Sequence, residues 1–181
     1  GHGIGPAMLM AETRAYLRIL TRNRNDLSLI LTLSNTMVGE DVGEERFVTM
    51  LLAKLDPEKR TLVYASAGHS PAFILGSDGA VKSELRRTGM PLGVMRDAEY
   101  TVSKPLRLAK GDVLVLLTDG LEETTNPEGE LFGTDRILKV VHQNRRLKAA
   151  KIVKSVFEAL ENFSGNAEQV DDLTMIVAKA E

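Results

Sequence analysis

The sequence predicts an α+β protein in which two antiparallel β-sheets are sandwiched between helices. Strand-like stretches come in pairs joined by short turns, as at residues 47–55 and 61–67 around the turn Asp56-Pro57-Glu58-Lys59. Helix-like stretches also come in pairs, one early and one late in the chain. Because strands and helices do not alternate singly, this order favours antiparallel hairpins over a parallel βαβ array.

The first half of the chain predicts two helices and four strands. Pro6 is favoured in the first turn of a helix, and strong helix formers follow it through residues 7–22. Asp26 can cap a second helix that runs to about residue 37. After an acidic loop at 39–45 come the strand pair described above and two short strands at 72–75 and 81–85, separated by Gly76-Ser77-Asp78-Gly79.

The second half predicts two further strands, two helices and a final strand. Residues 88–93 form a loop rich in Gly and Pro, and residues 100–108 alternate enough for an exposed strand. Residues 112–117 are nearly all apolar, which predicts a strand buried on both faces. Helices at 134–143 and 149–163 and a last buried strand at 173–177 complete the chain. With no repeat or linker, we expect one domain over residues 1–181.

The composition excludes several classes of protein. Of 181 residues, 43% are hydrophobic and 27% are charged, and the net charge of −2 argues against a nucleic-acid-binding surface. There are no cysteines, so the chain has neither disulfides nor thiolate metal sites. No apolar run approaches the roughly 20 residues of a membrane span, and no signal peptide is evident. These features favour a cytoplasmic protein.

Acidic residues mark the ends of the two most apolar strands. Asp119 follows the strand at 113–117, and Asp171 and Asp172 directly precede the strand at 173–177. If these strands are antiparallel neighbours, the acids meet at one edge of a sheet, where a divalent cation such as Mg²⁺ or Mn²⁺ would relieve their repulsion. The alternative is that they are ordinary turn residues.

Other residues allow both a functional and a structural interpretation. The glycine-rich start, Gly1-His2-Gly3, could bind phosphate before a helix or could merely cap that helix. His69 could be a metal ligand, a general acid or a structural residue. His142 lies in a helical stretch and is predicted to be at the surface.

Taken together, the motifs resemble those of bacterial PPM-type protein phosphatases of the sporulation stage II protein E group, which includes stress-response phosphatases acting on sigma-factor regulators. The resemblance spans essentially the whole chain. It is carried by six segments in order: Gly1-His2-Gly3-Ile4-Gly5-Pro6-Ala7, Ala67-Gly68-His69-Ser70-Pro71, Gly89-Met90-Pro91-Leu92-Gly93, Gly111-Asp112, Thr118-Asp119-Gly120-Leu121-Glu122-Glu123 with residues 126–133, and Asp171-Asp172-Leu173-Thr174.

The resemblance implies a centre of two Mn²⁺ or Mg²⁺ ions between the two sheets. Asp119 and Asp171 would be ligands, with Asp172 and Gly120 beside them and the turn Gly1-His2-Gly3 near the phosphate or metal. His69 stands where eukaryotic relatives have an acid near a third metal. Family members carry further acids upstream of the Gly-His-Gly turn. We therefore expect this chain to lack N-terminal strands of the domain and to be weakly active or inactive alone.

The implied reaction is hydrolysis of phosphoserine or phosphothreonine by a metal-activated water. The expected substrate is a regulatory protein of the anti-anti-sigma type, and the expected partner within a longer protein is an upstream sensor or receiver domain. An unpaired sheet edge or the first two helices would favour a homodimer. The alternatives are a non-catalytic dimerisation or interaction module, and another two-metal hydrolase such as a phosphodiesterase. The latter class usually shows several His ligands, whereas this chain has three His in all.

Overall fold

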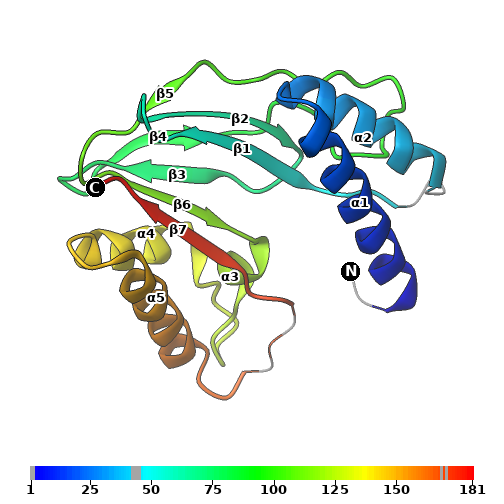
Figure 1. Cartoon of the computed structure of the whole chain (residues 1–181). Coiled ribbons are helices and arrows are strands. Elements are labelled where there is room, and N and C mark those ends of the chain that lie inside the picture. The colour runs from blue at the N-terminus through cyan, green and yellow to red at the C-terminus, as the bar shows by residue number, and fades with distance from the viewer. Residues whose placement is uncertain (1–2, 42–45, 168, 170) are drawn as a thin grey trace. The chain divides into compact units, whose positions relative to one another are not determined.

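The computed structural model describes residues 3–41, 46–167, 169 and 171–181. The chain divides into two compact units. Figure 1 labels the helices and strands named below. The first consists of Gly1–His69 and Arg87–Arg107, and the second of Ser70–Arg86 and Leu108–Glu181. The predicted single domain over residues 1–181 stays a prediction, and each unit is described separately below.

The first unit contains two helices and a three-stranded sheet. The helices are α1 (Ile4–Asn23) and α2 (Leu27–Asp41). The strands β1 (Met50–Asp56), β2 (Thr61–Ala67) and β5 (Leu106–Arg107) lie in the order β1-β2-β5 and are antiparallel. As predicted, Asp26 caps α2, since its Oδ1 accepts the backbone N–H of Ser28 at 2.9 Å. Helix α2 packs against β1 and β2 and buries an apolar core.

A buried amide joins α2 to the loop that follows the second unit's first strands in sequence. Asn35 is fully buried, and its Nδ2 donates to the carbonyl oxygens of Met95 at 2.8 Å and Arg96 at 2.9 Å. Its Oδ1 accepts the backbone N–H of Gly93 at 2.9 Å and the hydroxyl of Tyr100 at 3.3 Å. This one side chain therefore satisfies four polar groups and is itself fully satisfied.

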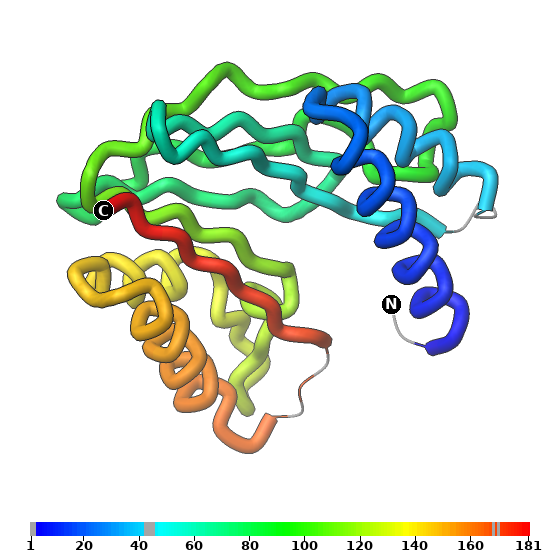
Figure 2. The backbone as a smooth tube through the Cα atoms, in the orientation of Figure 1, coloured from blue at the N-terminus to red at the C-terminus, as the bar shows by residue number. Residues whose placement is uncertain are grey.

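The second unit contains a four-stranded sheet and three helices. The strands are β3 (Ala72–Leu75), β4 (Val81–Leu85), β6 (Val113–Leu117) and β7 (Met175–Lys179), in the order β4-β3-β6-β7. Every pair is antiparallel. The helices are α3 (Asp119–Glu123), α4 (Gly133–Asn144) and α5 (Ala149–Ser164). Figure 2 shows the chain running from α5 back along β7 beside β6.

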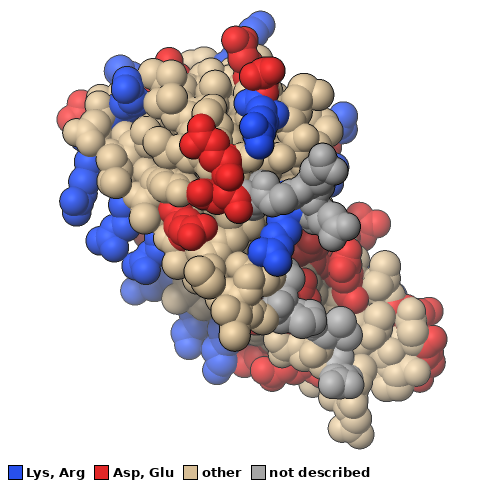
Figure 3. Space-filling model, turned by 90° about the vertical axis from the view of Figure 1, so that its right-hand side faces the viewer, with Lys and Arg blue, Asp and Glu red and all other residues tan. Residues whose placement is uncertain are grey.

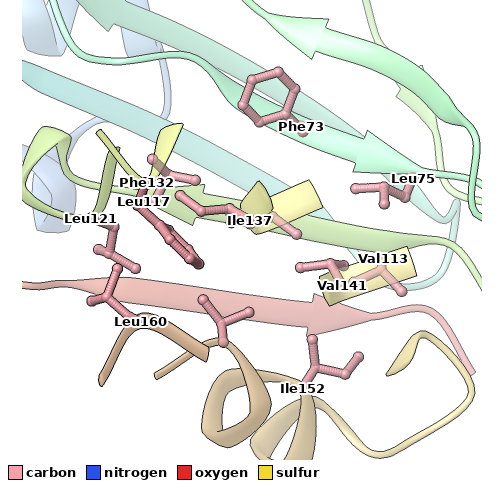
Figure 4. Packing of buried hydrophobic residues seen from close by; sticks show 12 residues of the cluster. Phe73, Leu75, Val113, Leu117, Leu121, Phe132, Ile137, Val141, Ile152 and Leu160 are labelled. Carbon is pink, nitrogen blue, oxygen red and sulfur yellow. The ribbon is translucent and has the colours of Figure 1, made fainter. Parts of the chain in front are cut away.

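The core of the second unit lies between its sheet and helices α4 and α5 (Figure 4). Ile137 and Val141 of α4 are spaced four residues apart and face the sheet, as do residues 152, 156 and 160 of α5. At one end of the helix pair, the Phe132 and Phe163 ring centroids lie 5.2 Å apart, and the Arg136 guanidinium lies 4.8 Å from the Phe163 centroid. These contacts fix the helices on the sheet.

The structure confirms the antiparallel sheets but shifts three predicted strands. The strand predicted at 47–55 begins only at Met50, because Val48 exchanges backbone hydrogen bonds with Leu92 instead. Of the strand predicted at 100–108, only Leu106–Arg107 pairs with β2. Tyr100 is buried rather than exposed, and Ser28 donates a hydrogen bond to its carbonyl oxygen.

The last strand and two shorter segments also differ from the prediction. The strand predicted at 173–177 begins at Met175 and is an edge strand rather than the buried strand that was predicted, with Ile176 57% exposed. The acidic stretch predicted as a loop at 39–45 is helical to Asp41, and residues 42–45 lie outside the described residues. Helix α3 was not predicted.

No helix within the described ranges is both long and apolar enough to cross a bilayer. On the face shown in Figure 3, acidic and basic side chains both occur, and neither sign covers that face alone.

Candidate metal centre

The register of β6 and β7 brings the predicted ligands to one end of one sheet. Leu117, the last residue of β6, lies opposite Met175, the first residue of β7. Asp119 comes two residues after Leu117, and Asp171 comes four residues before Met175. Because the strands are antiparallel neighbours, both acids leave the sheet at the same end. This backbone placement is the one that the sequence predicted.

Hydrogen bonds hold the two segments together beyond the strands. The Thr118 N–H donates to the Thr174 carbonyl at 3.0 Å, and the Thr174 N–H donates to Thr118 Oγ1 at 3.1 Å. The Thr118 hydroxyl in turn lies 3.3 Å from the Asp172 carbonyl oxygen. The Thr118 side chain thus continues the hydrogen bonding between the two segments beyond the last regular strand pair.

Gly120 permits a close approach that no other residue would allow. A Cβ placed on Gly120 would lie 2.5 Å from the Asp172 carbonyl oxygen and 3.3 Å from its carbonyl carbon. Both are backbone atoms, so they cannot move aside as a flexible side chain could. Gly120 therefore lets the turn that carries Asp119 lie directly against the segment that carries Asp171 and Asp172.

Both candidate carboxylates are exposed and hydrogen-bonded to adjacent backbone. Asp119 Oδ1 accepts the Gly120 N–H at 3.1 Å, and Asp171 Oδ1 accepts the Asp172 N–H at 2.7 Å. None of the ion pairs found within the described residues involves Asp119, Asp171 or Asp172. This end of the sheet therefore carries negative charge that no described basic side chain pairs with.

The donor chemistry fits a hard divalent cation. Carboxylate and carbonyl oxygens are the ligands that Mg²⁺ and Mn²⁺ prefer. The segments offer the carboxylates of Asp119 and Asp171, with the Asp172 carboxylate and carbonyl beside them. Among the described residues, however, no three His, Cys, Asp or Glu side chains form a ready metal cluster. That the two carboxylates share one cation stays a prediction.

Helix α3 adds to the acidic character of this end of the sheet. It begins at Asp119 and also carries Glu122 and Glu123. Acidic residues in a first helical turn are favoured by the helix dipole. Glu122 accepts a hydrogen bond from the Thr134 hydroxyl, which ties α3 to the start of α4. Leu121 is fully buried, so one apolar side chain anchors this short helix to the core.

His69 belongs to the first unit, in a turn built by glycine. Its Nδ1 lies 3.4 Å from Thr49 Oγ1. Gly68 has φ +67°, and a Cβ there would lie 2.4 Å from Pro91 Cγ. The Gly68 N–H also donates to the Gly89 carbonyl at 3.0 Å. The motifs at residues 67–71 and 89–93 therefore pack together. The glycines in both motifs are the sequence signal that could have predicted this contact. A metal role for His69 stays a prediction.

The structure describes part of the glycine-rich start and His142, the remaining residues singled out in the sequence. Gly1 and His2 lie outside the described residues, whereas Gly3 has φ +98° and its carbonyl accepts the Ala7 N–H at 3.2 Å at the start of α1. This contact is that of a helix start, and a phosphate-binding role stays a prediction. His142 is exposed, as predicted, and its Nδ1 lies 3.1 Å from the Gly79 carbonyl oxygen.

Comparison with known families decides the chain's affiliation. The family described as Stage II sporulation protein E (SpoIIE) matches residues 1–181. The chain belongs to the SpoIIE family. The family resemblance predicted from the six motifs is thus confirmed.

Named relatives of this SpoIIE-family chain include phosphatases. The chain is 29% identical over 179 residues to "Phosphoserine phosphatase RsbU" of Bacillus subtilis, covering 99% of this chain and 52% of that protein. It is 31% identical over 145 residues to "Protein IcfG" of Synechocystis, covering 80% of this chain and 22% of that protein. The chain therefore spans about half of the first relative and less of the second.

Solved structures confirm the α+β fold with two antiparallel sheets. The chain matches the SiaA-PP2C domain of Pseudomonas aeruginosa with a TM-score of 0.84 and 22% identity, covering 100% of this chain and 71% of that one. It matches the PP2C phosphatase domain of SpoIIE from Bacillus subtilis, solved with a fragment of its regulatory domain, with a TM-score of 0.78 and 20% identity. That match covers 99% of this chain and 51% of that chain.

Proposed function

We propose that this chain carries the metal-binding catalytic region of a protein serine/threonine phosphatase. The observation that carries the proposal is the β6–β7 register, which sends Asp119 and Asp171 out of the same end of the sheet. Family membership and the relatives named phosphoserine phosphatase support it. A phosphodiesterase is less well supported, because such two-metal sites usually use several His ligands and the chain has three His.

In this proposal Asp119 and Asp171 hold Mn²⁺ or Mg²⁺. When bound, two such ions would lower the pKa of a water so that it can attack phosphorus in line. Gly120 keeps the Asp119 turn against the Asp172 carbonyl, so the separation of the two acidic segments is fixed by the backbone. Asp172 and the turn Gly1-His2-Gly3 would act beside the ligands. No protein nucleophile is needed, and the chain has no cysteine to supply one.

We expect weak activity from these 181 residues alone. The described residues hold no cluster of three candidate ligand side chains. A two-metal centre needs more oxygen ligands than two carboxylates provide, and Mg²⁺ binds weakly when its protein ligands are few. The further ligands would then come from chain segments beyond the described residues, and a longer chain that includes them should release phosphate faster with Mn²⁺.

The proposed substrate is a phosphorylated regulatory protein of the anti-anti-sigma type. Support comes from relatives named phosphoserine phosphatase RsbU and RsbP. Because the chain spans only 52% of RsbU, a longer protein could also contain an upstream sensor or receiver domain as its partner. Both are proposals that the chain's own residues do not test.

A second proposal, an interaction module, has one specific observation in its favour. Ile4, Met8 and Ile19 of α1 are 81%, 59% and 62% exposed, and they recur at helical spacing on one face. Such a face suits a homodimer or a contact with another domain. Light scattering of the chain against an Ile4→Gln/Met8→Gln variant tests this idea, since a monomer in both cases would contradict it.

The catalytic proposal is tested with a phosphoserine protein and a phosphodiester, each assayed with added Mn²⁺. In a longer chain that includes the further ligands, we expect release of phosphate from the phosphoserine substrate, and loss of that release in Asp119→Asn or Asp171→Asn. Glu128→Gln is the matched control, because it removes one exposed acid from the turn after α3. Hydrolysis of the diester alone would reject the proposal. Unchanged rates in both Asp variants would also reject it.

A further inference from the structure

A basic surface pocket lies in the second unit. Its volume is about 410 Å³. The side chains that matter here are four cations, one acid and one apolar residue: Lys110, Arg146, Lys148, Lys179, Glu181 and Leu147. The four cations come from three places in the sequence, so the pocket is a product of the fold rather than of a local run of charge.

The fold places this pocket at the end of the β6–β7 pair opposite the candidate metal ligands. Val113 at the start of β6 pairs with Lys179 at the end of β7. The Gly111 N–H donates to the Ala180 carbonyl at 2.7 Å, which closes the base of the pair. A five-residue strand spans roughly 17 Å, so the pocket and Asp119 are separated by about that length.

The turn between α4 and α5 forms the other side of the pocket. Lys179 Nζ donates to the Leu147 carbonyl at 2.9 Å, which fixes the lysine and ties the turn to β7. The Leu147 N–H donates to the Asn144 carbonyl at 2.9 Å, so the turn is hydrogen-bonded on both sides. A fixed frame of this kind lowers the ordering cost of binding a ligand.

The charge in the pocket is unbalanced. Four basic side chains face one acid, Glu181. None of these residues takes part in the ion pairs found within the described parts of the chain. The surrounding side chains therefore neutralise little of the positive charge in the pocket, and a bound multivalent anion would neutralise it.

We propose that this pocket binds a small phosphate-bearing anion with at least two negative charges, such as pyrophosphate or the phosphate chain of a nucleotide. The volume lies within the range of about 300–1,000 Å³ typical of small-ligand sites. Arg146 can hold two phosphate oxygens at once, and the lysines add point charges. Leu147, 44% exposed, offers an apolar contact to a base or sugar. An extended acidic peptide would need a longer groove.

The test is calorimetric titration of the metal-free protein with inorganic pyrophosphate and, separately, with ATP. We expect both to bind with an affinity that falls as salt rises, and Arg146→Gln/Lys148→Gln to weaken binding at least tenfold. Lys151→Gln/Lys154→Gln is the matched control, since it removes two exposed cations from α5 outside the pocket. This control should change affinity less than twofold. Thermal melting of each variant verifies that it is folded.

The outcomes separate this inference from the proposed phosphatase function. Asp119→Asn should leave pyrophosphate binding unchanged, because the proposed pocket does not use that residue. Tighter binding of ATP than of pyrophosphate would show that Leu147 contacts the base or sugar. Equal binding would show that the pocket contacts only the phosphates. No binding at millimolar anion, equal losses in the two double variants, or binding of an acidic peptide but not of pyrophosphate would overturn the proposal.

Discussion

Replacing Gly120 with alanine should disturb both stability and metal binding. The new Cβ would lie 2.5 Å from the Asp172 carbonyl oxygen, so one backbone segment must move. Overpacking of this kind costs about 1–3 kcal/mol, and the better helix propensity of alanine in α3 returns roughly 0.5–1 kcal/mol. Because the clashing Asp172 carbonyl is backbone and cannot rotate away, the overpacking cost lies at roughly 2–3 kcal/mol, and the net loss is about 1–2.5 kcal/mol. In a chain of this size that lowers Tm by roughly 2–10 °C.

The same movement would separate the segments that carry Asp119 and Asp171. Changes next to metal ligands typically weaken metal binding about 10–100-fold, and we expect a similar rise in the Mn²⁺ concentration needed for half-saturation. Thermal melting and Mn²⁺ titration followed by electron paramagnetic resonance measure the two effects.

Gly39→Ala is the control for Gly120→Ala. Its Cβ would meet Arg96 Cγ at an ordinary 3.4 Å within helix α2, so stability should be unchanged or slightly higher. A Gly120→Ala protein with wild-type Tm and Mn²⁺ affinity would refute the reasoning.

Three further predictions concern charge and ionisation. In a longer chain that includes the further ligands, Asp171→Asn should abolish phosphate release and weaken Mn²⁺ binding while circular dichroism stays unchanged; retained turnover would argue against a metal role. Lys82→Met should lower the free energy of unfolding by about 2 kcal/mol in urea, because it removes the ammonium group 2.6 Å from the buried Asp112 carboxylate, which keeps its hydrogen bond from the Ala109 N–H. The cost falls below that of a fully buried pair because Lys82 is half exposed. Lys59→Met, in an exposed pair, should change stability by less than about 1 kcal/mol, and an equal effect would contradict the role of burial. Burial raises the pKa of Tyr100 to about 12. Between about pH 10 and pH 12 the folded state therefore keeps a proton that the unfolded state loses. The contribution of this group to stability is complete below pH 10 and is lost as the pH rises to about 12. Tyr100→Phe should therefore show a shallower fall in stability over that range, and an unchanged slope would exclude Tyr100 as a cause.

The fold could be predicted where apolar pattern and turn chemistry agreed. Strands at 61–67, 72–75, 81–85 and 113–117 have the predicted bounds, and the paired helices lie within one or two residues of theirs at most ends. The exceptions arose where the backbone or a side chain found another partner. Val48 pairs with Leu92 instead of extending the first strand. In the stretch predicted as a strand at 100–108, the Ser103 N–H donates to the Tyr64 carbonyl at 2.8 Å, but the Tyr64 N–H donates to the Ser103 hydroxyl rather than to its carbonyl. Pro105, which has no N–H, interrupts the same stretch.

The candidate site could be predicted only as far as strand order allowed. Asp119 follows one apolar run and Asp171 precedes another, which predicted that both acids lie at one edge of a sheet. The β6–β7 register confirms that placement of the backbone. Helix α3 was missed because five residues are too short to show a helical period. The contact between Gly120 and the Asp172 carbonyl is a close approach of backbones, which no pattern of side chains encodes.

The four hydrogen bonds of Asn35 make helix α2 and residues 93–100 one cooperative unit. Release of the loop would leave the fully buried carboxamide of Asn35 without its four hydrogen-bond partners, which makes opening of the loop by itself costly. The Gly93 N–H, which donates to Asn35, should therefore exchange with solvent on the timescale of the helix rather than on that of a surface connection. The last residue of what looks like a Gly/Pro loop in the sequence thus shares the hydrogen exchange of the helix.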